Sequence, residues 1–292
     1  MSLTAVHGPL SGEAAGRFNF ELRPPGAALY LDPMPYRIRA IFEGETVVDA
    51  HRPYLLHESG RLPVYYFEAD ELRLDLFERQ EGRRRDEHKG EAERWTLRVG
   101  ERAVPDAAWS YVRPAESAGF LDGLYALEWG AADEWFCEDE QLYGHPRDPY
   151  SRIDVYRTNR HLRVVLDGEL LAETRRASAL YETGLPSRYY IPAEDVRTEL
   201  LVPSSHRSRC AYKGSASYWS VRVGDRLVDD LVWSYPDPEH DGEPVRDLLC
   251  FFNERVDLEL DGEPVERPRT QFSRDDESSG QGAQALRGLT RS

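Results

Sequence analysis

The chain has 292 residues, of which 40% are hydrophobic and 31% charged, and its formal net charge is −16. This composition is typical of globular domains and supplies enough apolar residues for two modest cores. The acidic balance argues against binding to duplex nucleic acid, which needs a basic surface, and against an anionic membrane surface.

No apolar run approaches the roughly 18 residues of a membrane-spanning helix, and Met1–Leu10 lacks the basic and apolar regions of a secretory signal. The cysteines Cys137, Cys210 and Cys250 form no CxxC pair and no spacing typical of Cys/His metal sites. The sequence therefore predicts a reduced, cytoplasmic protein with no structural metal and no cofactor.

Changes in residue composition along the chain predict two domains joined by a linker and followed by a tail. The linker between them holds Gly144, Pro146 and Pro149, which make a stiff turn. The C-terminal tail is rich in Ser, Gly, Gln and Asp and predicts disorder. The predicted segments are an N-terminal lead segment 1–36, a first domain 37–140, the linker 141–152, a second domain 153–272 and the tail 273–292.

Hairpin signals recur in both domains. Short runs of aromatic and β-branched residues are separated by turn-forming pairs, which is typical of all-β proteins. The turns are Glu43-Gly44, Gly100, Asp167-Gly168, Gly224-Asp225 and Asp261-Gly262.

A few segments depart from this pattern. Ala69–Leu76 and Ala193–Leu200 each predict a single helical turn, and Val245–Asn253 fits either a helix or a buried strand. The basic cluster Arg83–Arg85 stands among acidic residues and is interpreted as a solvated loop.

The two domains are copies of one sequence, related by a shift of 124 residues, as from 58 to 182. This period is too long for a solenoid repeat of about 20–50 residues and is close to one small domain. The matched residues include Glu58/Glu182, Tyr65/Tyr189, Tyr66/Tyr190, Lys89/Lys213, Gly90/Gly214, Trp95/Trp219, Trp109/Trp233 and Tyr111/Tyr235.

The runs Leu180–Tyr190, Cys210–Trp219 and Leu231–Pro236, together with the linker His145–Tyr150, resemble tandem members of domain-of-unknown-function family 427, found mainly in bacteria. The resemblance covers roughly residues 38–272. It implies two small all-β domains of the β-tent kind, with one or two short helices, and it implies no settled activity.

The family has carried a nucleotidyltransferase label, which the residues do not favour. That chemistry needs a Gly-Ser turn and two carboxylates on one side of a strand to share metal ions. Gly214 and Ser215 are present, but Asp229 and Asp230 are adjacent and would point to opposite faces. The first copy has Glu91 in place of Ser215.

The favoured interpretation is a binding module whose second domain holds a small polar ligand in an aromatic-lined pocket. The Glu182 carboxylate and the Lys213 ammonium group would supply charge, and aromatic side chains would form the walls of the pocket. The candidates are Glu182, Tyr189, Cys210, Lys213, Trp219, Trp233 and Tyr235, and their first-domain counterparts are Glu58, Tyr65, Lys89, Trp95, Trp109 and Tyr111.

Two other readings stay open. Lys213 could lower the pKa of the Cys210 thiol and make an enzyme nucleophile, although the first copy has Asp86 in place of that cysteine. The chain could instead be a structural or interaction module without a pocket. Trp129, Trp135 and Phe136 occur only in the first copy and are candidates for a contact between domains.

Overall fold

The computed structural model describes residues 3, 8–10, 16–21, 23, 27–270 and 272–273. The chain divides into two compact units, and the boundary along the sequence lies between Asp148 and Pro149. Within the described residues, no helix is long and apolar enough to cross a membrane. Of the tail 273–292 that the sequence predicts to be disordered, residues 274–292 lie outside the described part of the chain.

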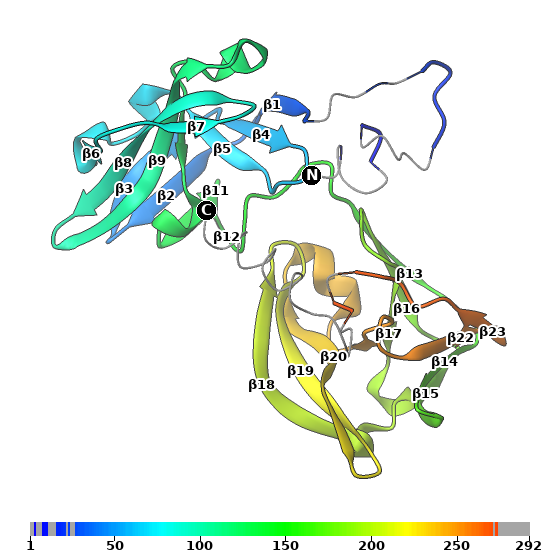
Figure 1. The fold of residues 1–292 in the computed structure, drawn as a ribbon. Coiled ribbons are helices and arrows are strands. Elements are labelled where there is room, and N and C mark those ends of the chain that lie inside the picture. The colour runs from blue at the N-terminus through cyan, green and yellow to red at the C-terminus, as the bar shows by residue number, and fades with distance from the viewer. Residues whose placement is uncertain are drawn as a thin grey trace. The chain divides into compact units, whose positions relative to one another are not determined.

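The first unit is built from two antiparallel sheets (Figure 1). The large sheet has the order β1-β4-β5-β10-β9-β8-β6, with β7 paired to β8, and the small sheet has the order β12-β11-β2-β3. The strands are β1 (Leu29–Pro33), β2 (Ile38–Phe42), β3 (Glu45–Ala50), β4 (Tyr54–Glu58), β5 (Val64–Phe67), β6 (Phe77–Arg79), β7 (Arg84–Asp86), β8 (Gly90–Val99), β9 (Arg102–Pro114), β10 (Tyr125–Leu127), β11 (Glu134–Cys137) and β12 (Glu140–Leu142).

The second unit repeats this arrangement. Its large sheet has the order β13-β16-β17-β21-β20-β19-β18, and its small sheet has the order β15-β14-β22-β23. The strands are β13 (Ile153–Arg157), β14 (Leu162–Leu166), β15 (Glu169–Thr174), β16 (Ser178–Glu182), β17 (Arg188–Ile191), β18 (Leu201–Cys210), β19 (Gly214–Val223), β20 (Arg226–Pro238), β21 (Leu249–Phe251), β22 (Asp257–Leu260) and β23 (Glu263–Val265).

The prediction of two homologous all-β domains is confirmed, and the predicted turns join neighbouring strands. Asp167 and Gly168 both have positive φ, as a two-residue hairpin between β14 and β15 requires. The described helices are short 3-10 turns. They are η1 (Ala69–Glu71), η2 (Leu74–Leu76), η3 (Glu116–Leu121), η4 (Trp129–Ala131), η5 (Ala193–Asp195), η6 (Thr198–Leu200) and η7 (His240–Val245).

The structure differs from the sequence-based picture at two places and decides a third that the sequence left open. Strand β1 lies inside the segment 1–36 that the sequence treats as a lead to the first domain, and it pairs with β4. The Arg83–Arg85 cluster was wrongly interpreted as a loop, because Arg84–Asp86 forms β7, although the arginines are exposed. The ambiguous run from Val245 resolves into strand β21 after the end of η7.

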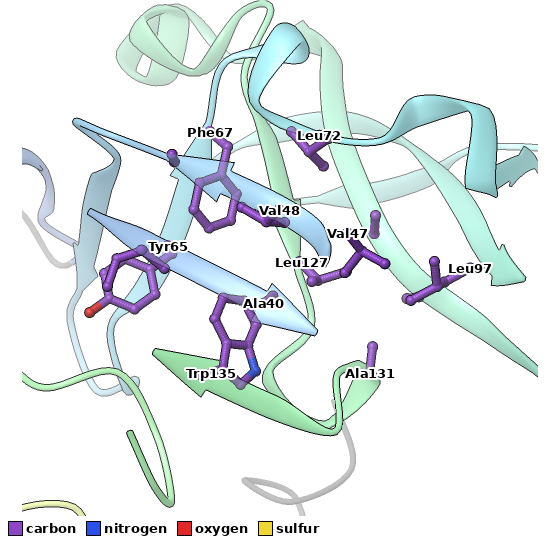
Figure 2. Close-up of a cluster of buried hydrophobic side chains, with 14 of the residues drawn as sticks. Ala40, Val47, Val48, Tyr65, Phe67, Leu72, Leu97, Leu127, Ala131 and Trp135 are labelled. Atoms are coloured by element: carbon purple, nitrogen blue, oxygen red, sulfur yellow. The ribbon is translucent and has the colours of Figure 1, made fainter. Parts of the chain in front are cut away.

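Each unit has a sandwich core between its two sheets. In the first unit, Figure 2 shows Val48 of the small sheet beside Phe67 of the large sheet, and Tyr65 of the large sheet stacks with Trp135 of the small sheet at 6.1 Å. Trp129 and Trp135 stack within this core, with ring centroids 4.8 Å apart. Core packing therefore accounts for the two tryptophans that the sequence suggested for a contact between domains.

The opposite face of each large sheet carries a second buried group, here called the far-face cluster. In the first unit η3 covers it, and in the second unit η7 does. The first cluster comprises Leu56, Tyr66, Ala92, Tyr111, Ala118, Leu121, Leu124 and Ala126, and the second Leu180, Tyr190, Ala216, Trp233, Tyr235, Val245 and Cys250.

Candidate functional site

A buried ion pair lies beside the far-face cluster of the first unit. The Nζ atom of Lys89 is 2.6 Å from a carboxylate oxygen of Glu58 and 3.1 Å from one of Asp86. The Lys89 and Glu58 side chains are only 5% and 10% exposed. The ammonium group of Lys89 is thus shared between two carboxylates away from bulk water.

The Asp86 carboxylate gathers further hydrogen bonds. It accepts the backbone N–H groups of His88 at 2.9 Å and Lys89 at 3.0 Å. Burial opposes ionisation of Asp86, but the bonds from Lys89 and His88 outweigh it and lower the pKa of the carboxyl group. Asp86 therefore serves as the anionic acceptor of the β7–β8 turn.

The second unit repeats the pair with two changes. Leu185 stands where the first unit has Arg61, which lies 3.3 Å from the Glu58 carboxylate, and the second change is at the acceptor beside the lysine. The ammonium group of Lys213 contacts the carboxylate of Glu182, and the two side chains are 8% and 10% exposed. Cys210 stands where the first unit has Asp86, since 86 and 210 differ by the same 124 residues as 89 and 213. Among the described residues, Lys213 therefore meets one carboxylate where Lys89 meets two.

These ion pairs require a strongly curled sheet. Glu58 ends β4 and Lys89 precedes β8, and β5, β10 and β9 lie between those strands in the sheet. Four steps between neighbouring strands span about 19 Å in a flat sheet, which is more than the two side chains can bridge. The 2.6 Å contact between Lys89 and Glu58 therefore shows that the sheet coils strongly enough to bring β4 and the start of β8 together.

A glycine after each lysine fixes the turn against the end of the neighbouring strand. Gly90 has φ +102, and a Cβ atom there would lie 2.3 Å from the Arg113 carbonyl oxygen. Gly214 has φ +93, and its Cβ would lie 2.7 Å from the Glu239 nitrogen. Both positions therefore need glycine for backbone conformation and for space.

The aromatic residues of the far-face cluster are arranged alike in both units. The Trp233 ring meets the Tyr190 ring edge-on at 6.1 Å and donates a 3.1 Å hydrogen bond to its hydroxyl group. Trp109 and Tyr66 repeat this contact at 6.4 Å and 3.2 Å. Burial raises the pKa values of Tyr190 and Tyr235, so both phenols stay neutral at ordinary pH.

The structure brings together only part of the predicted site. Trp233 and Tyr235 belong to the far-face cluster, the partly buried Cys210 packs against it, and Glu182 and Lys213 adjoin it. Tyr189 and Trp219 pack against the sandwich core, as Tyr65 and Trp95 do in the first unit. Adjacent residues of a strand point to opposite faces, so Tyr189 and Tyr190 cannot line one pocket together.

One signal in the sequence was missed. Lys89 and Lys213 are the only lysines in the chain, whose 37 basic residues are otherwise arginine. The chain thus keeps a compact ammonium group only at these two equivalent buried positions. A planar guanidinium does not replace an ammonium group in a small enclosed site.

A second buried cation was also missed, and it has no counterpart in the first unit. Arg188 binds the Glu254 carboxylate through two 2.7 Å bonds, and its guanidinium lies 5.5 Å from the centre of the Trp233 ring. The first unit has Val64 and Gly130 at these positions. No local spacing marks this contact, because its partners are far apart in the chain.

Other candidate chemistry is dispersed. Ser215 pairs with Asp237 across the ladder, away from the Asp229–Asp230 pair. Within the described part of the chain, no group of three or more His, Cys, Asp or Glu residues is placed to hold a metal ion. A hollow of about 410 Å³ in the second unit is lined by none of the predicted site residues, but by His161, Glu173, Thr174, Arg175, Arg176 and Asp195.

Comparison with known proteins agrees with the repeat. A search of curated proteins found no match. The family profile described as a domain of unknown function (DUF427) matches twice, over residues 30–138 and 154–262. The two matches together span more than half of the chain, which therefore belongs to the DUF427 family as a tandem of two such domains.

Proposed function

We propose that the second unit binds a small polar ligand at the face that carries Glu182 and Lys213. The observation that carries this proposal is the restriction of lysine to two equivalent, buried, ion-paired positions. A buried ion pair contributes little net stability compared with apolar residues of similar volume. Its presence in both units therefore favours a role in positioning or recognition.

The surroundings suit such a ligand. Trp233 and Tyr235 supply aromatic surface beside the pair, while Cys210 and Tyr218 are partly exposed at its edge. Tyr189 and Trp219 lie on the other face of the sheet and support it from the sandwich core. The proposal includes a reducing, cytoplasmic setting, with which the three free thiols agree.

A thermal-shift screen of the full chain tests the proposal against nucleosides, nucleotides, amino acids and common cofactors. A ligand present at 100 times its dissociation constant adds about 2.7 kcal/mol to the stability of the folded state. We expect a ligand whose effect disappears in Lys213→Met and remains in the matched Lys89→Met variant. Ligands that act equally on both variants, or none at all, would reject the proposed small-molecule ligand.

A second candidate is an interaction module without a pocket, which the enclosure of Glu182 and Lys213 favours. Tyr156 and Tyr181, exposed by 61% and 46%, offer an aromatic surface on the same unit. A screen without a single reproducible ligand, combined with a protein partner lost in a Tyr156→Ser, Tyr181→Ser variant, would establish this candidate in place of the first.

The enzyme alternative uses Cys210 or Lys213 and is tested by alkylation with iodoacetamide across pH. Burial raises the pKa of the Cys250 thiol to about 12, so Cys250 is an internal control that should not react in the folded protein. A Cys210 that reacts no faster than free cysteine at neutral pH removes the thiolate form of this alternative.

A further inference from the structure

The two ion-pair sites differ in chemistry, because the first unit has the Asp86 carboxylate where the second has the Cys210 thiol. In the first unit, three donors of the β7–β8 turn converge on the Asp86 carboxylate: the Lys89 ammonium group and the N–H groups of His88 and Lys89. Oriented backbone N–H groups beside a cation form an anion-binding nest. The first unit fills its own nest with Asp86.

The second unit keeps the backbone that forms this nest. Cys210 pairs with Gly214 as Asp86 pairs with Gly90, and the carbonyl of Lys213 is bound by Glu239 N at 3.1 Å as that of Lys89 is by Ala115 N at 3.0 Å. Among the described residues, the carboxylate that Lys213 contacts is that of Glu182, through its ammonium group. The turn is preserved while its acceptor is changed.

A thiol is a poor substitute for the carboxylate. Its sulfur ends where the carboxyl carbon of an aspartate would be, so it offers a weak acceptor in place of two charged oxygens. Lys213 is 6% exposed, and among the described residues its ammonium group meets one carboxylate, that of Glu182, so a second acceptor would satisfy its remaining donors. An external carboxylate would restore the acceptor, and the partial exposure of Cys210 leaves an approach to it.

We infer that the ligand of the second unit carries a carboxylate group, which binds the Lys213 ammonium group beside the Cys210 sulfur, on the side where the Asp86 carboxylate meets Lys89 in the first unit. This inference rests on the proposed function and names the chemical class of the ligand. Glu182 holds the ammonium group from its other side, as Glu58 does for Lys89. The first unit, which supplies the carboxylate from its own chain, binds no such ligand.

The restriction to two lysines allows a direct test on the full chain. Protein labelled with ¹³C,¹⁵N-lysine gives two side-chain signals, which Lys89→Arg and Lys213→Arg assign. Formate and acetate are the probes, with chloride as the ionic-strength control. We expect both carboxylates to shift the Lys213 signal in a saturable manner and to leave the Lys89 signal in place.

Exchange variants make the test specific. Cys210→Asp should weaken formate binding by about tenfold or more, because the new carboxylate occupies the charge-assisted bonds that formate would make. Cys210→Ser should retain binding, and Asp86→Cys should make the Lys89 signal respond. Melting curves confirm that each variant is folded, and Asp86→Cys carries the test if Cys210→Asp is not.

The outcomes separate the two proposals. A Lys213 signal that formate and acetate leave unmoved, or that chloride moves as much, overturns the carboxylate inference. A screened ligand that needs Lys213 but binds Cys210→Asp unchanged also overturns it, while the proposed function stands. A Lys213 signal that responds to formate, with no ligand found in the screen, retains the carboxylate site and rejects a larger ligand.

Discussion

At the scale of single residues, the ion pairs decide how each unit tolerates change. Lys213 and Glu182 are almost enclosed, so either one without the other leaves a charge that water cannot reach. Removing both charges together leaves no such penalty. Substituting one partner of the pair therefore lowers the stability of the unit strongly, whereas replacing both with apolar residues changes it little. The net contribution of the pair to the stability of the unit is thus small.

We expect Lys213→Met to lower the free energy of unfolding by about 3–5 kcal/mol, because it strands the buried Glu182 carboxylate. The double variant Glu182→Leu, Lys213→Met should recover most of that loss. Urea unfolding of both variants measures the difference. Equal destabilisation in the single and double variants would show that packing of the lysine stem, and not charge, matters.

Asp86 makes the stability of the first unit depend on pH in the acid range. Its pKa is lowered in the folded state, so the unfolded chain, with a value of about 3.9, takes up a proton first as pH falls. Its contribution is present above about pH 4 and is lost as pH falls through the folded pKa.

The variant Asp86→Asn should therefore be less stable than the wild type at neutral pH by about 1.5–3 kcal/mol, and the difference should shrink as pH falls through the folded pKa of Asp86. Urea midpoints measured across pH check this. The exposed Asp122→Asn variant, at the residue that follows η3, serves as the control and should follow the wild type. A constant difference at every pH would exclude the carboxylate as its cause.

At the scale of elements, the lysine turn anchors one end of the large sheet. The residue before β8 contacts the end of β4, and the glycine that follows presses against the backbone at the end of β9. The hairpins themselves were predictable from Gly and Asp at their turns. Their coiling was not, because it depends on a contact between strands that are not neighbours.

We expect Gly90→Ala to destabilise the first unit far more than Gly100→Ala. Both glycines have positive φ, which costs an L-residue about 1–2 kcal/mol, but only Gly90 would also bring its Cβ within 2.3 Å of a carbonyl oxygen. Gly100 has open space around it. Urea unfolding of the two variants compares the costs, and similar values would contradict the close approach.

At the scale of the whole molecule, the duplicated fold carries two different sites. Each unit has its own sandwich core and its own far-face cluster, built from its own residues. Only the second has Cys210 beside its lysine and the buried Arg188–Glu254 contact against Trp233. The copies therefore share a scaffold and differ in the chemistry around it.

Separate cores predict that the units respond separately to substitution. Lys89→Met should lower the unfolding temperature of the first unit by about 10 °C or more and leave the second in place. Scanning calorimetry resolves the two transitions, and Lys213→Met should move the other one. A single transition that moves equally in both variants would show that the units unfold together.

The sequence by itself determined the duplication, the β class and most turns, because these depend on the residues that stand close together in the chain. It also selected Glu182, Lys213 and the aromatic residues as candidates. Tertiary structure decided which of them meet. Trp219 and Tyr189 lie on one face of the sheet and Trp233 and Tyr190 on the other, since the order of strands sets the neighbours and alternation along each strand sets the face.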